Sequence, residues 1–213
     1  MKARFLIAAA CGLLASSTTH AQVVGRPCVT GTLASYIALG AGGCMFESTL
    51  YRDFTYAAPV STTITPEQIL VIPSSGVSVT TPYPGLTFYA PWNAGKDQEL
   101  TSIIGYNTVP FPPNASVEVL ATDLTLDLGA TSVGGIIGSV EVTEKVNEAS
   151  VTLPQELQVY EICEDACRLK KTDTTSLAGL ETLTHALTIT LEGGTGGASL
   201  NYFTANQSYG PLP

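Results

Sequence analysis

Apolar and polar residues alternate along much of the chain with the two-residue period of a β-strand. The clearest example is Leu124–Leu128, in which every second residue is leucine. The same period runs through Val140–Thr143 and through Leu187–Leu191. Because successive side chains of a strand point to opposite faces, each of these segments predicts a strand with one buried face and one solvated face.

Further segments are rich in β-branched and aromatic residues and are separated by Gly, Pro, Ser and Asn, which favour turns. Long helical patterns are missing between them, and the one candidate helix is the brief Thr32–Leu39. Many short strands at close spacing predict an all-β fold, an antiparallel β-sandwich or a jelly-roll-like single domain. The additional predicted strands are Ser48–Tyr56, Ile69–Ile72, Val77–Thr80, Leu86–Ala90, Ser102–Val109, Ser116–Leu120, Leu157–Ile162 and Ala198–Phe203.

The first 21 residues have the layout of a cleaved export signal. Lys2 and Arg4 form a basic start, Phe5–Ala15 is apolar, and small residues lead to Ala21. This layout predicts cleavage between Ala21 and Gln22. The apolar run is too short to cross roughly 30 Å of hydrocarbon, which disfavours a membrane anchor. The predicted organisation is therefore a signal peptide over 1–21 and one β-sandwich domain over 22–213.

The charge balance narrows the classes of partner. The 213 residues include 9 Lys and Arg against 18 Asp and Glu, and the predicted cleavage removes two basic residues, which changes the net charge from −9 to −11. An acidic chain with few cations does not favour nucleic acid or anionic lipid as a partner. No later segment is long and apolar enough to predict a transmembrane helix. The partners that remain open are an extracellular polysaccharide, a surface protein and a second copy of the chain.

Four cysteines follow the predicted cleavage site, namely Cys28, Cys44, Cys163 and Cys167. An even number of cysteines in an exported chain predicts disulfides, and proximity in the sequence favours Cys28–Cys44 and Cys163–Cys167. A zinc site would need further ligands, and only one histidine, His185, follows the cleavage site. Free thiols remain the other alternative.

The N-terminal block resembles a known family. Cys28-Val-Thr-Gly-Thr-Leu-Ala-Ser-Tyr-Ile-Ala-Leu-Gly-Ala-Gly-Gly-Cys44 leads into Leu50-Tyr-Arg-Asp-Phe-Thr-Tyr56. This arrangement is similar to the opening of exported bacterial PEP-CTERM sorting-domain proteins, and later blocks around Gly85–Phe88, Ile103–Tyr106 and Gly193–Leu200 resemble them too.

The resemblance implies an exported, β-rich protein sorted to the cell surface or the extracellular matrix, with no established enzymatic role. Such families usually end in a Pro-Glu-Pro motif, an apolar helix and a basic tail, whereas this chain ends at Ser208-Tyr-Gly-Pro-Leu-Pro213. A member without that tail is expected to be released or to be held by other contacts.

The residues predict no catalytic, cofactor or metal site. His185 lies in phase with Leu187 and Leu191, which places it on the apolar face of its strand, and no Gly-x-Ser-x-Gly elbow accompanies it. Asp123 and Asp127 share the opposite, solvated face of another strand. A glycosidase needs two carboxylates across a cleft at a defined separation, which the sequence does not specify. A calcium site, which would need clustered oxygen ligands, stays open, although no EF-hand or nonapeptide loop is present.

Three segments are candidates for contacts with other molecules. Tyr83, Tyr89 and Trp92 are a candidate aromatic platform for sugar rings, although a lone tryptophan is also a common core residue. Charges around Cys163 and Cys167 predict an exposed hairpin tip, and Gly193–Gly197 predicts a hairpin turn.

Together these features predict a secreted, non-enzymatic surface, matrix or structural protein of a bacterium. The alternatives are a β-sandwich carbohydrate-binding module and a filament-forming subunit. Location in the periplasm is the alternative to secretion.

Overall fold

The structure is a computed structural model that describes residues 25–60, 63–77, 82–111, 117–127, 129–148, 155–180 and 182–211. The helix α1 spans Leu33–Ile37 and is followed by a short 3-10 helix, Gly40–Gly42. The strands are β1 (Gly31–Thr32), β2 (Cys44–Phe46), β3 (Thr49–Val60), β4 (Leu70–Val77), β5 (Pro82–Ala94), β6 (Glu99–Pro110), β7 (Val117–Thr125), β8 (Thr131–Val133), β9 (Ile137–Glu148), β10 (Gln155–Glu164), β11 (Ala166–Lys170), β12 (Thr172–Leu180), β13 (Leu183–Glu192) and β14 (Ala198–Pro211).

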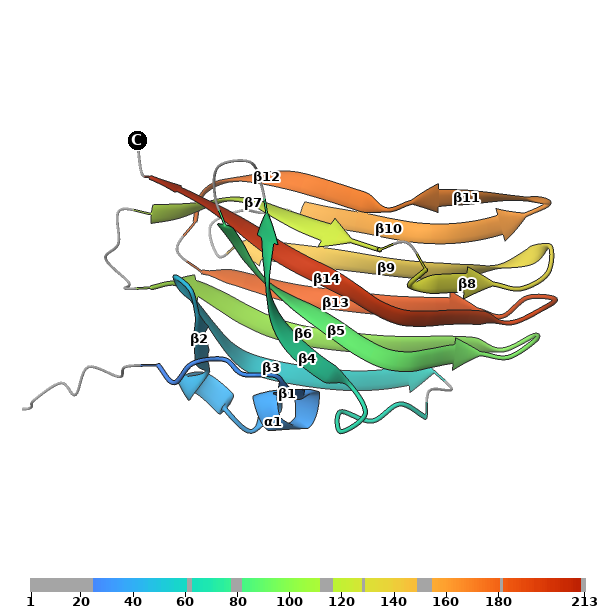
Figure 1. Ribbon diagram of the computed structural model, residues 1–213, viewed down its shortest axis with the longest axis horizontal. Helices are drawn as coiled ribbons and strands as arrows, with labels where there is room; N and C mark the ends of the chain where they lie inside the picture. Colours follow the sequence, from blue (N-terminus) through green and yellow to red (C-terminus); the bar gives the residue numbers. More distant parts are fainter. Residues whose placement is uncertain are drawn as a thin grey trace, which may run out of the picture.

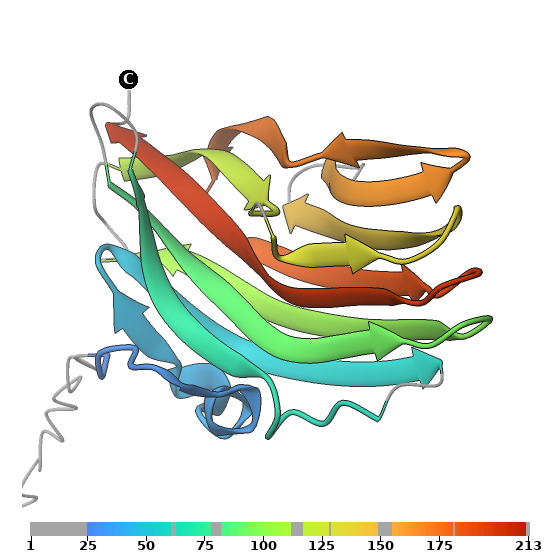
Figure 2. The same cartoon turned by 45° about the vertical axis from the view of Figure 1, so that its right-hand side comes forward.

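In the described ranges these strands form two seven-stranded antiparallel sheets, which pack face to face as the predicted β-sandwich. The β5–β14 sheet has the order β1–β4–β5–β14–β7–β12, with β8 added alongside β14. The β6–β13 sheet has the order β11–β10–β9–β13–β6–β3–β2. Figure 2 shows the two layers, and Figure 1 shows β14 and β5 lying over β13 and β6. The predicted strand Val77–Thr80 lies outside the described residues except for Val77.

Alternation places one face of each central strand in the core. Along β6 the burial of side chains alternates from Leu100 to Pro110, and along β13 it alternates from Leu183 to Leu191. Complete burial of a large apolar side chain contributes roughly 1.5–3 kcal/mol relative to exposure, so the register that buries these residues is strongly favoured.

An aromatic cluster joins the two sheets. Phe54 of β3 stacks on Tyr106 of β6, with ring centroids 5.5 Å apart. Tyr106 in turn approaches Phe88 of the opposite sheet at 6.2 Å. Phe88 stacks on Phe203 at 5.3 Å, and Trp92 lies 5.8 Å from Phe203. The rings therefore form a continuous contact from β3 to β14 across the core.

The predicted helix Thr32–Leu39 is confirmed as α1. Thr32 caps its N-terminus, because its hydroxyl accepts a hydrogen bond from the Ser35 amide at 3.2 Å. The helix buries Leu33 and Tyr36, and the Tyr36 hydroxyl donates to the Val29 carbonyl at 2.9 Å. Burial raises the pKa of Tyr36 to about 12. Together, α1 and β1 cover one side of the sandwich (Figure 2).

On the opposite side of the sandwich, the chain crosses from one sheet to the other between β11 and β12. β11 pairs with β10 in one sheet, and after Lys171 the chain continues as β12, which pairs with β7 in the other. Asp173 stabilises this crossing, since it accepts from the Gln158 amide at 2.9 Å and pairs with Lys170 at 2.7 Å. These strands were not among those predicted, because their sequence lacks the alternation of a half-buried strand.

The predicted hairpin at Gly193–Gly197 is wrong. The segment connects β13 of one sheet to β14 of the other, so it is a turn between layers. The backbone of this turn packs directly against the backbone of two neighbouring turns. A β-carbon added at Gly193 would overlap the carbonyl oxygen of Gly95, and one added at Gly194 would overlap the carbonyl oxygen of Ile137. Close approach of these turns therefore requires glycine.

We predict that Gly193→Ala lowers the free energy of unfolding by about 1–3 kcal/mol, the usual cost of overpacking, because backbone has to move. Gly42→Ala is the matched control, since a β-carbon there meets nothing within 4 Å. Urea unfolding of the two variants measures the difference. Equal stability would contradict the close packing of the turns.

Candidate functional site

A connected set of buried polar side chains crosses the core. His185 on β13 lies between two partners: its Nδ1 is 2.7 Å from Glu144 Oε1, and its Nε2 is 2.9 Å from Thr108 Oγ1. Gln207, on β14 of the opposite sheet, places its Nε2 2.7 Å from His185 Nε2 and donates to Thr108 Oγ1 at 2.9 Å. We call Glu144, His185, Thr108 and Gln207 the buried relay.

The hydrogen bonds assign the imidazole tautomer. The Tyr209 hydroxyl donates to Gln207 Oε1 at 2.7 Å, which orients the amide so that its hydrogens face Thr108 and His185. His185 Nε2 is then an acceptor, and the ring proton lies on Nδ1 and points to Glu144. The second oxygen of Glu144 has no hydrogen-bond partner.

The buried relay has the partners of a hydroxyl–imidazole–carboxylate triad but lacks access to solvent. Thr108 and His185 are each 1% exposed, and Glu144 is fully buried. The ring of Tyr106 covers the imidazole, with centroids 4.6 Å apart and planes 8° from parallel. A substrate would have to enter between packed sheets to reach Thr108, so this geometry joins the sheets and does not expose a nucleophile.

His185 lies on the apolar face, as predicted, whereas its partners were not singled out from the sequence. A signal for them exists in the strand period. Glu144 has the same parity as the buried Val142 and Val146, and Gln207 has the same parity as Phe203 and Ala205. Polar residues in phase with a buried face indicate a buried polar contact.

The predicted aromatic platform of Tyr83, Tyr89 and Trp92 is corrected by the structure. Trp92 is fully buried on the inner face of β5, next to Phe203, whereas Tyr89 points outward and is 37% exposed. The two residues are three positions apart, and an odd separation places side chains on opposite faces of a strand. The side chain of Tyr83 lies outside the described part of the chain.

Tyr89 instead pairs with a tyrosine on the adjacent strand. Tyr202 of β14 is its register partner, and the two rings stack with centroids 4.7 Å apart and planes 24° from parallel. The register between β5 and β14 shifts next to this pair, opposite Pro91, which has no amide hydrogen to donate. Leu70 of β4, 38% exposed, is the register partner of Tyr89 on the other side.

A shallow hollow lies beside Tyr202 where the chain crosses between the sheets. Its volume is about 440 Å³, and it is lined by Thr125, Leu126, Asp127, Lys171, Thr172 and Tyr202. Burial raises the pKa of Tyr202, and the nearby negative charge of Asp127 raises it further. The hollow thus combines an aromatic ring, hydroxyls, a carboxylate and an ammonium group.

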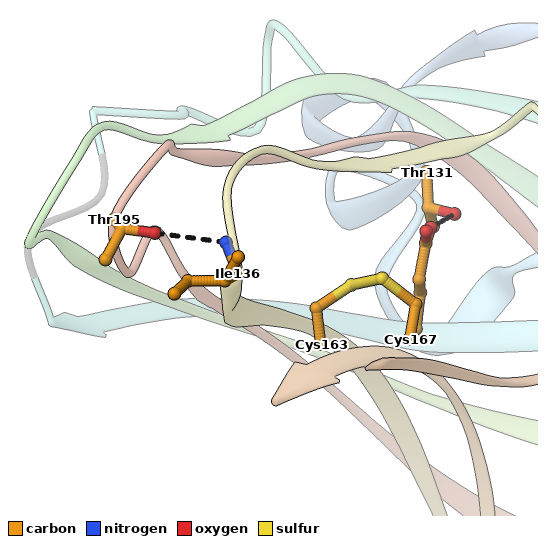
Figure 3. Close-up of a disulfide and its surroundings, with 6 residues drawn as sticks. Thr131, Ile136, Cys163, Cys167 and Thr195 are labelled. Carbon is orange, nitrogen blue, oxygen red and sulfur yellow. Dashed lines mark hydrogen bonds between the residues drawn. A yellow bond between two sulfur atoms is a disulfide. The ribbon is translucent and has the colours of Figure 1, made fainter. Parts of the chain in front are cut away.

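Both disulfides follow the pairing that sequence proximity favours, Cys28–Cys44 and Cys163–Cys167. The second joins register partners of β10 and β11 at the predicted hairpin tip (Figure 3). The tip is attached to neighbouring turns: the Asp165 amide donates to the Ile136 carbonyl at 3.1 Å, and the Ile136 amide donates to Thr195 Oγ1 at 3.2 Å. Ile136 itself is 61% exposed.

Metal sites and membrane spans were searched for in the described residues. No group of three or more His, Cys, Asp or Glu side chains there is placed to hold a metal ion. None of the helices in those ranges has the length and apolar content that a bilayer span needs.

Comparisons with known proteins identify no family. Neither a protein-family model nor a curated protein matches the chain. Among solved structures, the chain is similar to the enzymatically active domain of tailspike protein 4 of bacteriophage CBA120, with 7% identity and a TM-score of 0.31 over 75% of this chain and 19% of that one. It is also similar to the family 11 carbohydrate-binding module of Clostridium thermocellum, with 6% identity and a TM-score of 0.25 over 75% of this chain and 89% of the module. At these TM-scores, neither likeness carries an argument about function.

We predict that Glu144→Ala lowers the free energy of unfolding by about 1–3 kcal/mol, because it leaves a fully buried imidazole N–H without an acceptor. Glu144→Gln keeps an acceptor oxygen and should lose clearly less. Urea unfolding followed by circular dichroism measures both.

Glu156→Ala on the neighbouring strand is the control. Its exposed pair with Lys145, 3.6 Å apart, should contribute less than about 1 kcal/mol. If Glu144→Ala were as stable as this control, the hydrogen bond between His185 and Glu144 would not stabilise the fold.

Proposed function

We propose that the chain is an exported, non-catalytic surface or matrix protein of a bacterium, a rigid scaffold that contacts extracellular polymers through its outer faces. The observation that carries this proposal is the burial of the relay. Its imidazole, carboxylate and hydroxyl are the groups best arranged for chemistry, and they are used inside the core. The outer surface, in contrast, offers the side chains of Tyr89 and Tyr202 and the hollow beside Tyr202 for contact with another molecule.

Export is supported by features of the sequence and of the fold. The first 21 residues have the layout of a signal peptide. The four cysteines that follow form two disulfides, which are common in proteins of oxidising compartments. On the chain-entropy model, a loop of the size closed by Cys28–Cys44 adds about 3 kcal/mol of stability, which benefits a protein working outside the cell.

Two of the sheet edges carry residues that oppose a filament built through open edges. Beyond Leu70 and Val71, which pair with β1, the edge strand β4 contains Pro73, which cannot donate to a further strand. The edge strand β11 carries the charged Arg168 and Lys170. Such residues discourage edge-to-edge pairing.

We predict that the protein is recovered from the medium or the extracellular matrix of its producing cell, with Gln22 as its first residue. Its intact mass should rise by four hydrogens on reduction, because two disulfides open. Cell fractionation with mass spectrometry before and after reduction tests this. A protein found inside the cell with four free thiols would contradict the proposal.

A further inference from the structure

We propose that the hollow beside Tyr202 is a binding site for a hexopyranose unit of a neutral extracellular polysaccharide. The inference rests on the proposed function, since it names the polymer that the scaffold contacts. It replaces the platform predicted from the sequence, in which Trp92 would have been exposed.

The aromatic wall of the site is one face of the Tyr202 ring. Tyr89 covers the other face of this ring at 4.7 Å, and Tyr89 is not part of the lining of the hollow. The proposed site uses the face of the Tyr202 ring that Tyr89 leaves uncovered, because Tyr202 lines the hollow and Tyr89 does not. Tyr89 supports the ring from behind, so the wall is held in place before a ligand arrives. A flat ring face of this kind packs against the C–H face of a pyranose.

The polar lining complements the hydroxyl groups of a sugar. Asp127 can accept hydrogen bonds and Lys171 can donate them, while Thr125 and Thr172 can do both. Within the described residues, the side chains of Asp127 and Lys171 form no ion pair. The adjacent Lys170, in contrast, is paired with Asp173 at 2.7 Å. A few polar groups around an apolar wall are typical of sites that orient a small ligand.

Charge selects a neutral polymer. The lining contains one carboxylate and one ammonium group, so its local charge is balanced. The chain as a whole has a formal net charge of −9, which repels a polyanion. The negative net charge of the chain therefore disfavours an acidic polysaccharide, and the balanced charge of the lining does not attract one.

The surroundings favour a polymer over a free sugar. Leu70, Tyr89 and Tyr202 are register partners on three adjacent strands and lie in one row on the outer face of the β5–β14 sheet. Neighbouring strands are about 4.8 Å apart, so the row extends the apolar surface by roughly 10 Å beside the hollow. Units on one side of the bound pyranose would continue along this row.

The test is affinity electrophoresis of the full chain in native gels that contain hydroxyethyl cellulose, laminarin, dextran, galactomannan or, as an anionic probe, alginate. We expect retardation by at least one neutral polymer and none by alginate. Tyr202→Ala should weaken binding at least tenfold, Tyr202→Phe should restore most of it, and Asp127→Asn should weaken it severalfold. Tyr160→Ala is the matched control, because Tyr160 is a half-buried tyrosine on β10 of the other sheet.

Three results would overturn the inference: no retardation by any neutral polymer, equal binding by Tyr202→Ala and the parent, or equal losses in Tyr202→Ala and Tyr160→Ala. Retardation by alginate alone would overturn the neutral class of ligand. Far-ultraviolet circular dichroism confirms that each variant is folded. Cell fractionation distinguishes a failure of the sugar-binding inference from a failure of the proposed function. An extracellular, disulfide-bonded protein that binds no sugar would contradict only the inference.

Discussion

Burial of one face of every central strand is the constraint on which the rest of this molecule depends. The side-chain period of a strand is two, so a shift of one residue in any ladder would move apolar residues such as Leu187 and Ile189 from the core to the solvent. The aromatic contacts between Tyr106 and Phe88 add a specific fit between the sheets. This constraint decides which residues can meet other molecules. Tyr89 is available because Phe88 and Ala90 on either side of it are buried, and Tyr202 follows the exposed Asn201 and precedes the buried Phe203.

The buried relay is the main exception to an apolar interior, and it is nearly complete in its hydrogen bonds. Its residues come from β6, β9, β13 and β14, so it links four strands and both sheets. Leaving one Glu144 oxygen without a partner costs roughly 1–3 kcal/mol. The arrangement pairs polar groups with one another and thereby favours a single register of the sheets. Its chemistry serves the fold, which is why the outer face is the better place to look for function.

Much of the fold could be predicted because alternation is a local signal. The strands around Leu124, Val140 and Leu187 and the helix capped by Thr32 are confirmed, and so is the position of His185 on the apolar face. Features that depend on contacts between distant segments could not be predicted. The crossing at Lys171 lacks a local pattern, and the turn at Gly193–Gly197 links two layers that only the tertiary structure places together.

The candidate site, too, could be predicted only where its features depend on local sequence. Tyr89 belongs to the predicted platform and is exposed, but its partner Tyr202 lies on a strand far along the chain. Trp92 belongs to the same predicted platform, but β5 extends past the predicted Leu86–Ala90 to Ala94, so the strand parity separates Trp92 from Tyr89. The alternation of Leu124–Leu128 predicts that Asp127 is solvated. Its place beside Lys171 could not be predicted, because it depends on the crossing between the sheets.

The most direct test of this account is the environment of Trp92, the only tryptophan of the chain. The fully buried indole should give blue-shifted fluorescence that iodide quenches little until the protein unfolds. Red-shifted emission that iodide quenches freely in the native protein would contradict the parity of β5, and with it the assignment of Tyr89 and Tyr202 to the outer face.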